Sequence, residues 1–126
     1  LLHRFPNVIA WISGHTHDNV IQPRPDTAGR SSGFWDIGTA AHIDWSCQSR
    51  ILELAIRVDG TISIFCTMID HAAPADPRGA SGLLGLASIH RELAANDYQY
   101  GFGSNGPGKP EDRNVELILP GPPWLR

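Results

Sequence analysis

Two histidines, His15 and His17, have the residue type and spacing that suggest chemistry in this sequence. They lie in the stretch WISGHTHDN, residues 11–19, directly after a short apolar run. In an extended segment, residues i and i+2 project to the same side of the backbone. Two imidazoles placed in this way would converge on two metal ions about 3.5–4 Å apart, with one histidine bound to each ion. We therefore predict that His15 and His17 are metal ligands.

Two small residues of the same loop are predicted to support this site. Gly14 has no Cβ, so it permits a sharp change of direction at the end of the strand and lets metals or substrate approach the backbone. The Thr16 hydroxyl can hold the loop through local bonds to the backbone. The alternative is a surface loop whose polar residues, the two histidines included, simply contact water.

The apolar segments around this loop predict the elements that position it. Residues 7–13, NVIAWIS, are rich in β-branched and aromatic residues, which predicts a strand buried on both faces. Residues 33–39 form a second predicted strand, and the Pro-, Gly- and Ser-containing segment between the two is expected to be a loop. His15 and His17 would then follow the carboxyl end of a strand, where open α/β sheets usually bind ligands.

Residues 49–70 predict a β-hairpin that turns near Asp59 and Gly60. A two-residue Asp-Gly turn would mix apolar and polar residues on one face, so we favour a three-residue loop, 58–60, with Gly60 left-handed. This register opposes Ile56 to Ile62, Leu54 to Ile64 and Leu52 to Cys66, and gives one apolar face. It also keeps Cys47 and Cys66 from being cross-strand partners, so both are expected to be buried free thiols.

The remaining residues divide into a linker, a helix and a tail. Residues 72–82 are rich in Pro, Gly and Ala, and predict a linker. Residues 83–97 carry Leu83, Leu86 and Leu93 at helical spacing, with Ser81 as candidate N-cap, and predict an amphipathic helix that must pack on another element. Residues 98–126 predict an extended Pro/Gly-rich tail with one short strand, NVELIL.

The composition excludes several classes of function. The chain has 126 residues, 41% of them hydrophobic, and a net charge of −3. No basic cluster suggests a nucleic-acid or anionic-membrane surface. No apolar stretch approaches the roughly 18 residues that a membrane-spanning helix needs. Because the sequence begins at Leu1 without a methionine, we expect it to be part of a longer protein.

The stretch NVIAWISGHTHDN resembles the last metal-binding motif, Gly-His-x-His, of the calcineurin-like metallophosphoesterases. The run GFWDIGTAAHIDWSCQSRILEL is similar to an uncharacterised bacterial branch of that superfamily. The resemblance covers about residues 1–71 and implies an α/β fold. The chain would be the C-terminal part of a layered metallophosphoesterase β-sandwich flanked by helices, ending in a β-hairpin, a helix and an extended tail.

The resemblance implies a hydrolase that cleaves phosphate mono- or diesters at a centre of two divalent metal ions, Mn, Fe or Zn. His15 would bind one metal and His17 the other. The family's other ligands come from an Asp-x-His, a Gly-Asp-x-x-Asp and an Asn-His motif, none of which occurs here. The chain is therefore expected to need the missing N-terminal part of the same protein and to be inactive alone. The alternative is a non-catalytic β-rich binding module with an incidental His-x-His loop.

Two further signals are weaker. His42 and Asp44 follow the second predicted strand and are candidate substrate-proximal residues, with the His42 imidazole donating to a substrate phosphate. Alternatively, Asp44 caps a turn and His42 sits half-buried beside Trp45. Residues 101–106, GFGSNG, match a dinucleotide-binding fingerprint, but no apolar strand precedes them and prolines follow where a helix must start, so we exclude that function.

Overall fold

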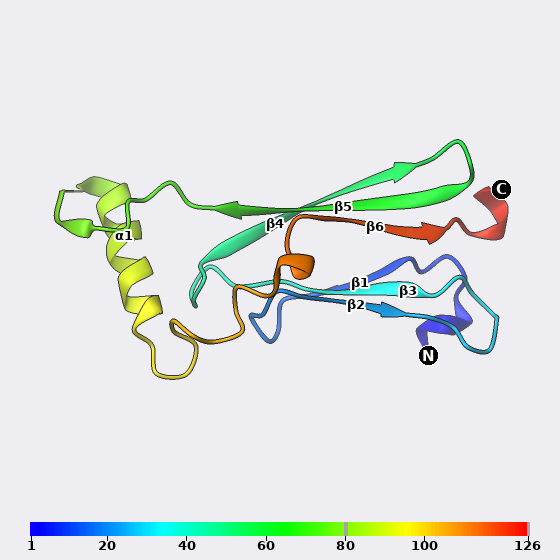
Figure 1. Ribbon diagram of the computed structural model, residues 1–126, viewed down its shortest axis with the longest axis horizontal. Coiled ribbons are helices and arrows are strands. Elements are labelled where there is room, and N and C mark those ends of the chain that lie inside the picture. Colours follow the sequence, from blue (N-terminus) through cyan, green and yellow to red (C-terminus); the bar gives the residue numbers. More distant parts are fainter. Residues whose placement is uncertain (80, 126) are drawn as a thin grey trace.

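The computed structural model describes residues 1–79 and 81–125, which form a mixed α/β protein with two three-stranded sheets and one α-helix (Figure 1). The first sheet contains β1 (Ala10–Ser13), β2 (Val20–Arg24) and β3 (Phe34–Gly38) in the order β1-β3-β2. β1 is parallel to β3, whereas β2 is antiparallel to it. A 3₁₀ turn, η1 (Leu2–Arg4), precedes this sheet.

The second sheet is wholly antiparallel and confirms the predicted hairpin. β4 (Gln48–Ile56) pairs with β5 (Thr61–Asp70), and β5 pairs with β6 (Val115–Pro120). Gly60 has φ +79°, in the left-handed region, and Arg57 pairs with Thr61 around a three-residue loop. The register opposes Ile56 to Ile62, Leu54 to Ile64 and Leu52 to Cys66, as predicted.

The hydrophobic core lies between the two sheets, which run one above the other (Figure 1). Ile37 of β3 is fully buried, and it packs in one cluster with apolar side chains of β5 and β6. Trp35 joins the sheets further, because its indole N–H donates to the carbonyl of Ile118 at 3.3 Å. The buried members of the cluster are Ile37, Ile62, Ile64, Cys66, Leu117 and Leu119.

The prediction for residues 7–33 needs two corrections. β1 is shorter than predicted and is not buried on both faces: it lies at the edge of its sheet, and Trp11 and Ile12 are 52% and 55% exposed. The segment predicted as a loop contains the strand β2. Pro23 hid this strand from the sequence pattern, but proline is tolerated in an outermost strand such as this one.

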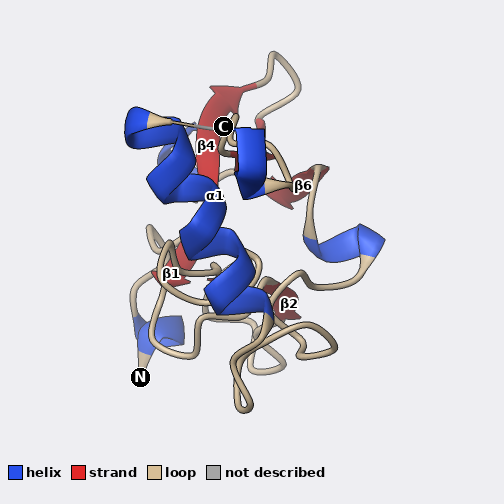
Figure 2. Ribbon diagram, turned by 90° about the vertical axis from the view of Figure 1, so that its left-hand side faces the viewer, coloured by secondary structure: helices blue, strands red, loops and turns tan. Residues whose placement is uncertain are grey.

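The α-helix α1 (Gly82–Ala95) lies across one end of the two sheets (Figures 1 and 2). Ser81 occupies the N-cap position as predicted, although its side chain makes no capping bond. The helix packs on other parts of the chain as expected, but not through its leucine stripe. The helix instead buries its small side chains, and the Ser88 hydroxyl donates to the carbonyl of Pro74. Leu86 and Leu93 stay mostly exposed.

The C-terminal segment is more closely integrated than an extended tail. The predicted strand is present as β6, and two 3₁₀ turns, η3 (Pro110–Asp112) and η4 (Pro123–Leu125), flank it. A third turn, η2 (Pro77–Gly79), lies in the predicted linker. Residues 101–106 form turns and are not followed by an α-helix, as expected for an incidental glycine pattern. In residues 1–79 and 81–125, no helix has the length and apolar character needed to cross a membrane.

Candidate functional site

The predicted metal loop lies at the carboxyl ends of the two parallel strands. β1 and β3 end in register, with Ser13 opposite Gly38, and the Thr39 N–H donates to the Ser13 carbonyl at 2.9 Å. The loop after β1, residues 14–19, therefore runs beside the loop after β3, residues 39–47. Polar side chains from the two loops can therefore contact one another at this end of the sheet.

His17 and Asp44 make this contact between the loops. The Nδ1 atom of His17 is hydrogen-bonded to the Asp44 carboxylate, and both side chains are partly buried, at 31% and 20% exposed. Since the carboxylate engages Nδ1, the Nε2 atom of His17 is left for another partner. A histidine that binds a metal usually donates its second ring N–H to a carboxylate in this way. The structure thus brings together two of the predicted site residues, one from each loop.

The local geometry of the loop differs from the prediction. The chain bends at His15 and Thr16, and His17 has φ +59°, in the left-handed region. The argument that an extended backbone projects both imidazoles to one side therefore does not hold. The His15 side chain is exposed, and it makes no hydrogen bond to any described residue. Whether both imidazoles bind metal remains a prediction.

Gly14 and Thr16 do not shape the loop as predicted. A Cβ on Gly14 would lie 4.0 Å from the Thr39 carbonyl, which is an ordinary contact, and the chain turns one residue later. A close approach of a metal or substrate to Gly14 remains a prediction. The Thr16 side chain is exposed, and it makes no hydrogen bond within residues 1–79 and 81–125.

His42 lies at a different place from His17. It is exposed, and its Nε2 atom is hydrogen-bonded to the Ser49 hydroxyl. It lines a pocket of about 360 Å³ at the junction of β4, β5 and α1, together with Cys47 and His71. Burial raises the pKa of the Cys47 thiol, so this cysteine is a poor nucleophile. A role for His42 near a substrate phosphate has no support from these contacts, and it remains a prediction.

Asn19 is a central residue that the sequence analysis missed. Its side chain is fully buried, and the amide NH₂ donates to Gln48 Oε1 at 3.1 Å and to the Pro107 carbonyl at 3.5 Å. Its Oδ1 atom accepts from the Ala40 N–H at 3.1 Å and from the Arg50 guanidinium at 3.0 Å. Asn19 therefore joins both site loops to the second sheet and to the C-terminal segment. No sequence signal separates it from the other polar residues of the same loop.

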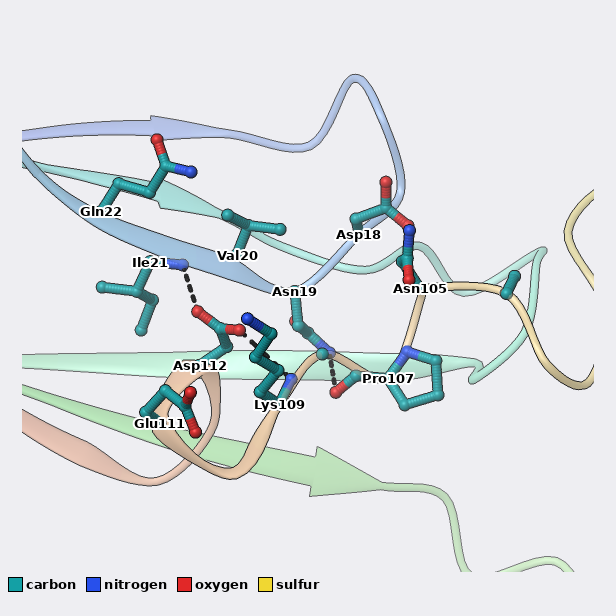
Figure 3. Close-up of a pocket in the computed structure, with 12 residues that line it drawn as sticks. Asp18, Asn19, Val20, Ile21, Gln22, Asn105, Pro107, Lys109, Glu111 and Asp112 are labelled. Atoms are coloured by element: carbon teal, nitrogen blue, oxygen red, sulfur yellow. Dashed lines mark hydrogen bonds between the residues drawn. The ribbon is translucent and has the colours of Figure 1, made fainter.

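A pocket of about 590 Å³ adjoins the loop of His15 and His17, between β2 and residues 104–112 (Figure 3). Asp18, which directly follows His17, forms part of its wall. The buried carboxylate of Asp112 closes one side, because it accepts from the backbone N–H of Ile21 at 2.7 Å and of Lys109 at 3.2 Å. Asp18 and Asn19 belong to the stretch that carries the two histidines. The composition of the C-terminal segment, in contrast, does not predict that it forms the other wall of this pocket.

No group of three or more His, Cys, Asp or Glu side chains within the described residues could hold a metal ion. The loop thus offers imidazole donors of the right chemistry but not a complete coordination sphere. No protein-family model, curated protein or solved structure matches this chain.

Proposed function

We propose that this chain supplies two histidine ligands, His15 and His17, to a dinuclear divalent-metal centre of a phosphoesterase. Two such cations would supply the Lewis acidity for hydrolysis of a phosphate mono- or diester. The remaining ligands would come from an N-terminal part of the same protein that these 126 residues do not include. The chain alone would be inactive.

The hydrogen bond between His17 and Asp44 is the observation that carries this proposal. The carboxylate occupies Nδ1 and fixes the ring orientation, so that Nε2 is the atom available for a metal. Asp44 would act as a positioning residue, since it contacts His17, the proposed metal ligand, rather than the substrate. His15 is accessible on the same loop and has no competing partner among the described residues.

The arrangement of the sheets is compatible with the proposed family. The two packed sheets would be the C-terminal part of a layered metallophosphoesterase β-sandwich, with the ligand loop at the carboxyl end of β1. Imidazole nitrogen suits Mn, Fe and Zn, so the donors do not select among these metals.

Metal binding by the full-length protein, which would include the other ligands, tests this proposal. We expect Zn²⁺ or Mn²⁺ titrated into the full-length protein to bind with an affinity that the double variant His15→Ala, His17→Ala loses. Asp44→Asn should weaken binding by about 10- to 100-fold, because the ring of His17 is no longer oriented. His3→Ala is the matched control, since His3 contacts Phe34 at the opposite end of β3. Calorimetry measures all four proteins.

Two results would contradict the proposal. Equal metal binding by the full-length protein and its double variant would remove the ligand assignment. Strong Mn²⁺-dependent hydrolysis of a phosphate ester by the chain alone would show that no further ligands are needed.

The second candidate is a non-catalytic β-rich binding module. The exposed apolar side chains of β1, Trp11 and Ile12, favour it, because such residues often mark interaction surfaces. In that case the histidines would be incidental, and their double substitution would leave metal binding unchanged.

A further inference from the structure

The pocket between β2 and residues 104–112 has walls that the fold holds in place (Figure 3). The Asn19 N–H donates to the Gly106 carbonyl at 3.1 Å, and the Asp112 carboxylate accepts from the Ile21 N–H at 2.7 Å. Gly108 has φ +68°, and a Cβ there would lie 2.3 Å from the Asn19 carbonyl, so a side chain would push the two walls apart. A preformed cavity of about 590 Å³ is of the size that small-molecule sites have.

The lining carries polar groups that are free to bind. The amides of Gln22 and Asn105, the carboxylates of Asp18 and Glu111, and the ammonium of Lys109 all line the cavity (Figure 3). None of these side-chain groups forms an ion pair or hydrogen bond with the described part of the chain. Amides both donate and accept, carboxylates accept and an ammonium donates. Such a mixed set matches hydroxyl groups, which also do both.

The charge of the lining disfavours anions. Three carboxylates, those of Asp18, Glu111 and Asp112, stand against Lys109, which is the only lysine of the sequence. The excess negative charge would repel a second phosphate group on a ligand. A neutral group meets no such penalty.

We propose that this pocket binds the leaving-group half of the phosphate ester, and that this half is an uncharged, hydroxyl-rich group such as a sugar or polyol. The inference rests on the proposed function. Asp18 lines the pocket and directly follows His17, the predicted metal ligand, so the pocket lies next to the proposed metal centre. Nucleotides and other polyphosphates would be poor substrates.

The test is a titration of the ¹⁵N-labelled full chain with myo-inositol and methyl α-D-glucopyranoside, in which NMR chemical shifts of the backbone amides report binding. We expect saturable shifts at the amides of the pocket. Gln22→Ala and Asn105→Ala should each weaken binding by about three- to tenfold, which is the effect of one lost hydrogen bond. Gln99→Ala is the matched control, because Gln99 is exposed and lies outside the pocket. Two separate pocket variants guard against a local folding defect in either one.

Pyrophosphate is the anionic probe. Little or no shift of the pocket amides is expected with it, and tighter binding of pyrophosphate than of the polyols would overturn the assigned ligand class. Absence of polyol shifts, or equal affinity in the pocket variants and the unaltered chain, would overturn the site itself.

The histidine double variant separates this inference from the proposed function. His15→Ala, His17→Ala should bind the polyols as well as the unaltered chain does. If the unaltered chain does not bind the polyols but the proposed metal centre does bind metal, only the pocket proposal is refuted. If the polyols bind but the double variant keeps its metal affinity, the phosphoesterase proposal fails while the pocket stands as a polyol site.

Discussion

The packed sheets and helix α1 use apolar residues in opposite ways. Between the sheets, Ile37, Ile62 and Ile64 are at most 3% exposed. On α1, Leu83, Leu86 and Leu93 are 64% to 85% exposed, and the helix contacts its neighbours through small residues. Burial of apolar surface is the main source of stability. The sheets and the loops tied to them should therefore carry the stability of the chain, whereas α1 should add little.

The largest expected effect comes from Asn19, which joins the site loops to the second sheet. Asn19→Ala leaves the Arg50 guanidinium and the Ala40 N–H without this partner in a buried setting. We expect a loss of about 3–5 kcal/mol in the free energy of unfolding, because the substitution removes four side-chain hydrogen bonds and leaves the Ala40 N–H without its acceptor, whereas Arg50 keeps its backbone carbonyl partners. Urea denaturation measures it.

Asn96→Ala is the control for this substitution. Asn96 caps the exposed C-terminus of α1, where its side chain donates to the Glu92 carbonyl. A smaller loss for Asn19→Ala than for Asn96→Ala would break the comparison between the packed sheets and helix α1.

The next test truncates one apolar residue in the core between the sheets and one on helix α1. Ile64→Ala should cost about 2–4 kcal/mol, since it leaves a cavity between the sheets. Leu86→Ala should stay within about 0.5 kcal/mol, as surface substitutions usually do. Both free energies come from urea unfolding followed by circular dichroism. A large loss for Leu86→Ala would mean that the leucine stripe is covered in solution.

The smallest effect is a pH dependence at the end of the sheets remote from α1. Burial alone would raise the pKa of Asp26, but the backbone N–H groups of Ala28, Arg30 and Ser31 and the Arg30 side chain lower it from 3.8 to about 2. The unfolded chain thus takes up a proton more readily, so the stabilisation is complete above pH 3.8 and is lost as the pH falls towards 2.

Asp26→Asn isolates this contribution. The difference in urea midpoint between the variant and the unaltered chain should be greatest near neutral pH and should shrink near pH 2. A difference that stays constant over this range would show that the carboxylate is not the group responsible.

The sequence predicts the local elements well and the long-range contacts poorly. The hairpin register follows from alternation and from Gly60, both of which act within twenty residues or so. β2 was missed because Val20 and Ile21 are too few to form a pattern and Pro23 argues against a strand. Its pairing with β3 and its contact with Asp112 depend on the fold, and no local signal reveals them.

The candidate site shows the same limit. His15 and His17 stand out by type and spacing, and Asp44 was placed near the site by its position after a strand. The hydrogen bond between His17 and Asp44 joins residues 27 apart and could not be predicted from either segment. The close approach of Gly106 and Gly108 to Trp45 and Asn19 explains glycines that composition alone assigns to an extended tail.

The position of β1 has one more consequence. Within the described residues, β1 pairs with β3 on one side only, so the backbone groups along its other side are open to a new partner. A strand that joined there in parallel would stop level with Ser13, and the segment after it would emerge next to His15. The first sheet can thus be widened by one strand without breaking an existing hydrogen bond, and the residues that follow such a strand would lie beside the loop of His15 and His17.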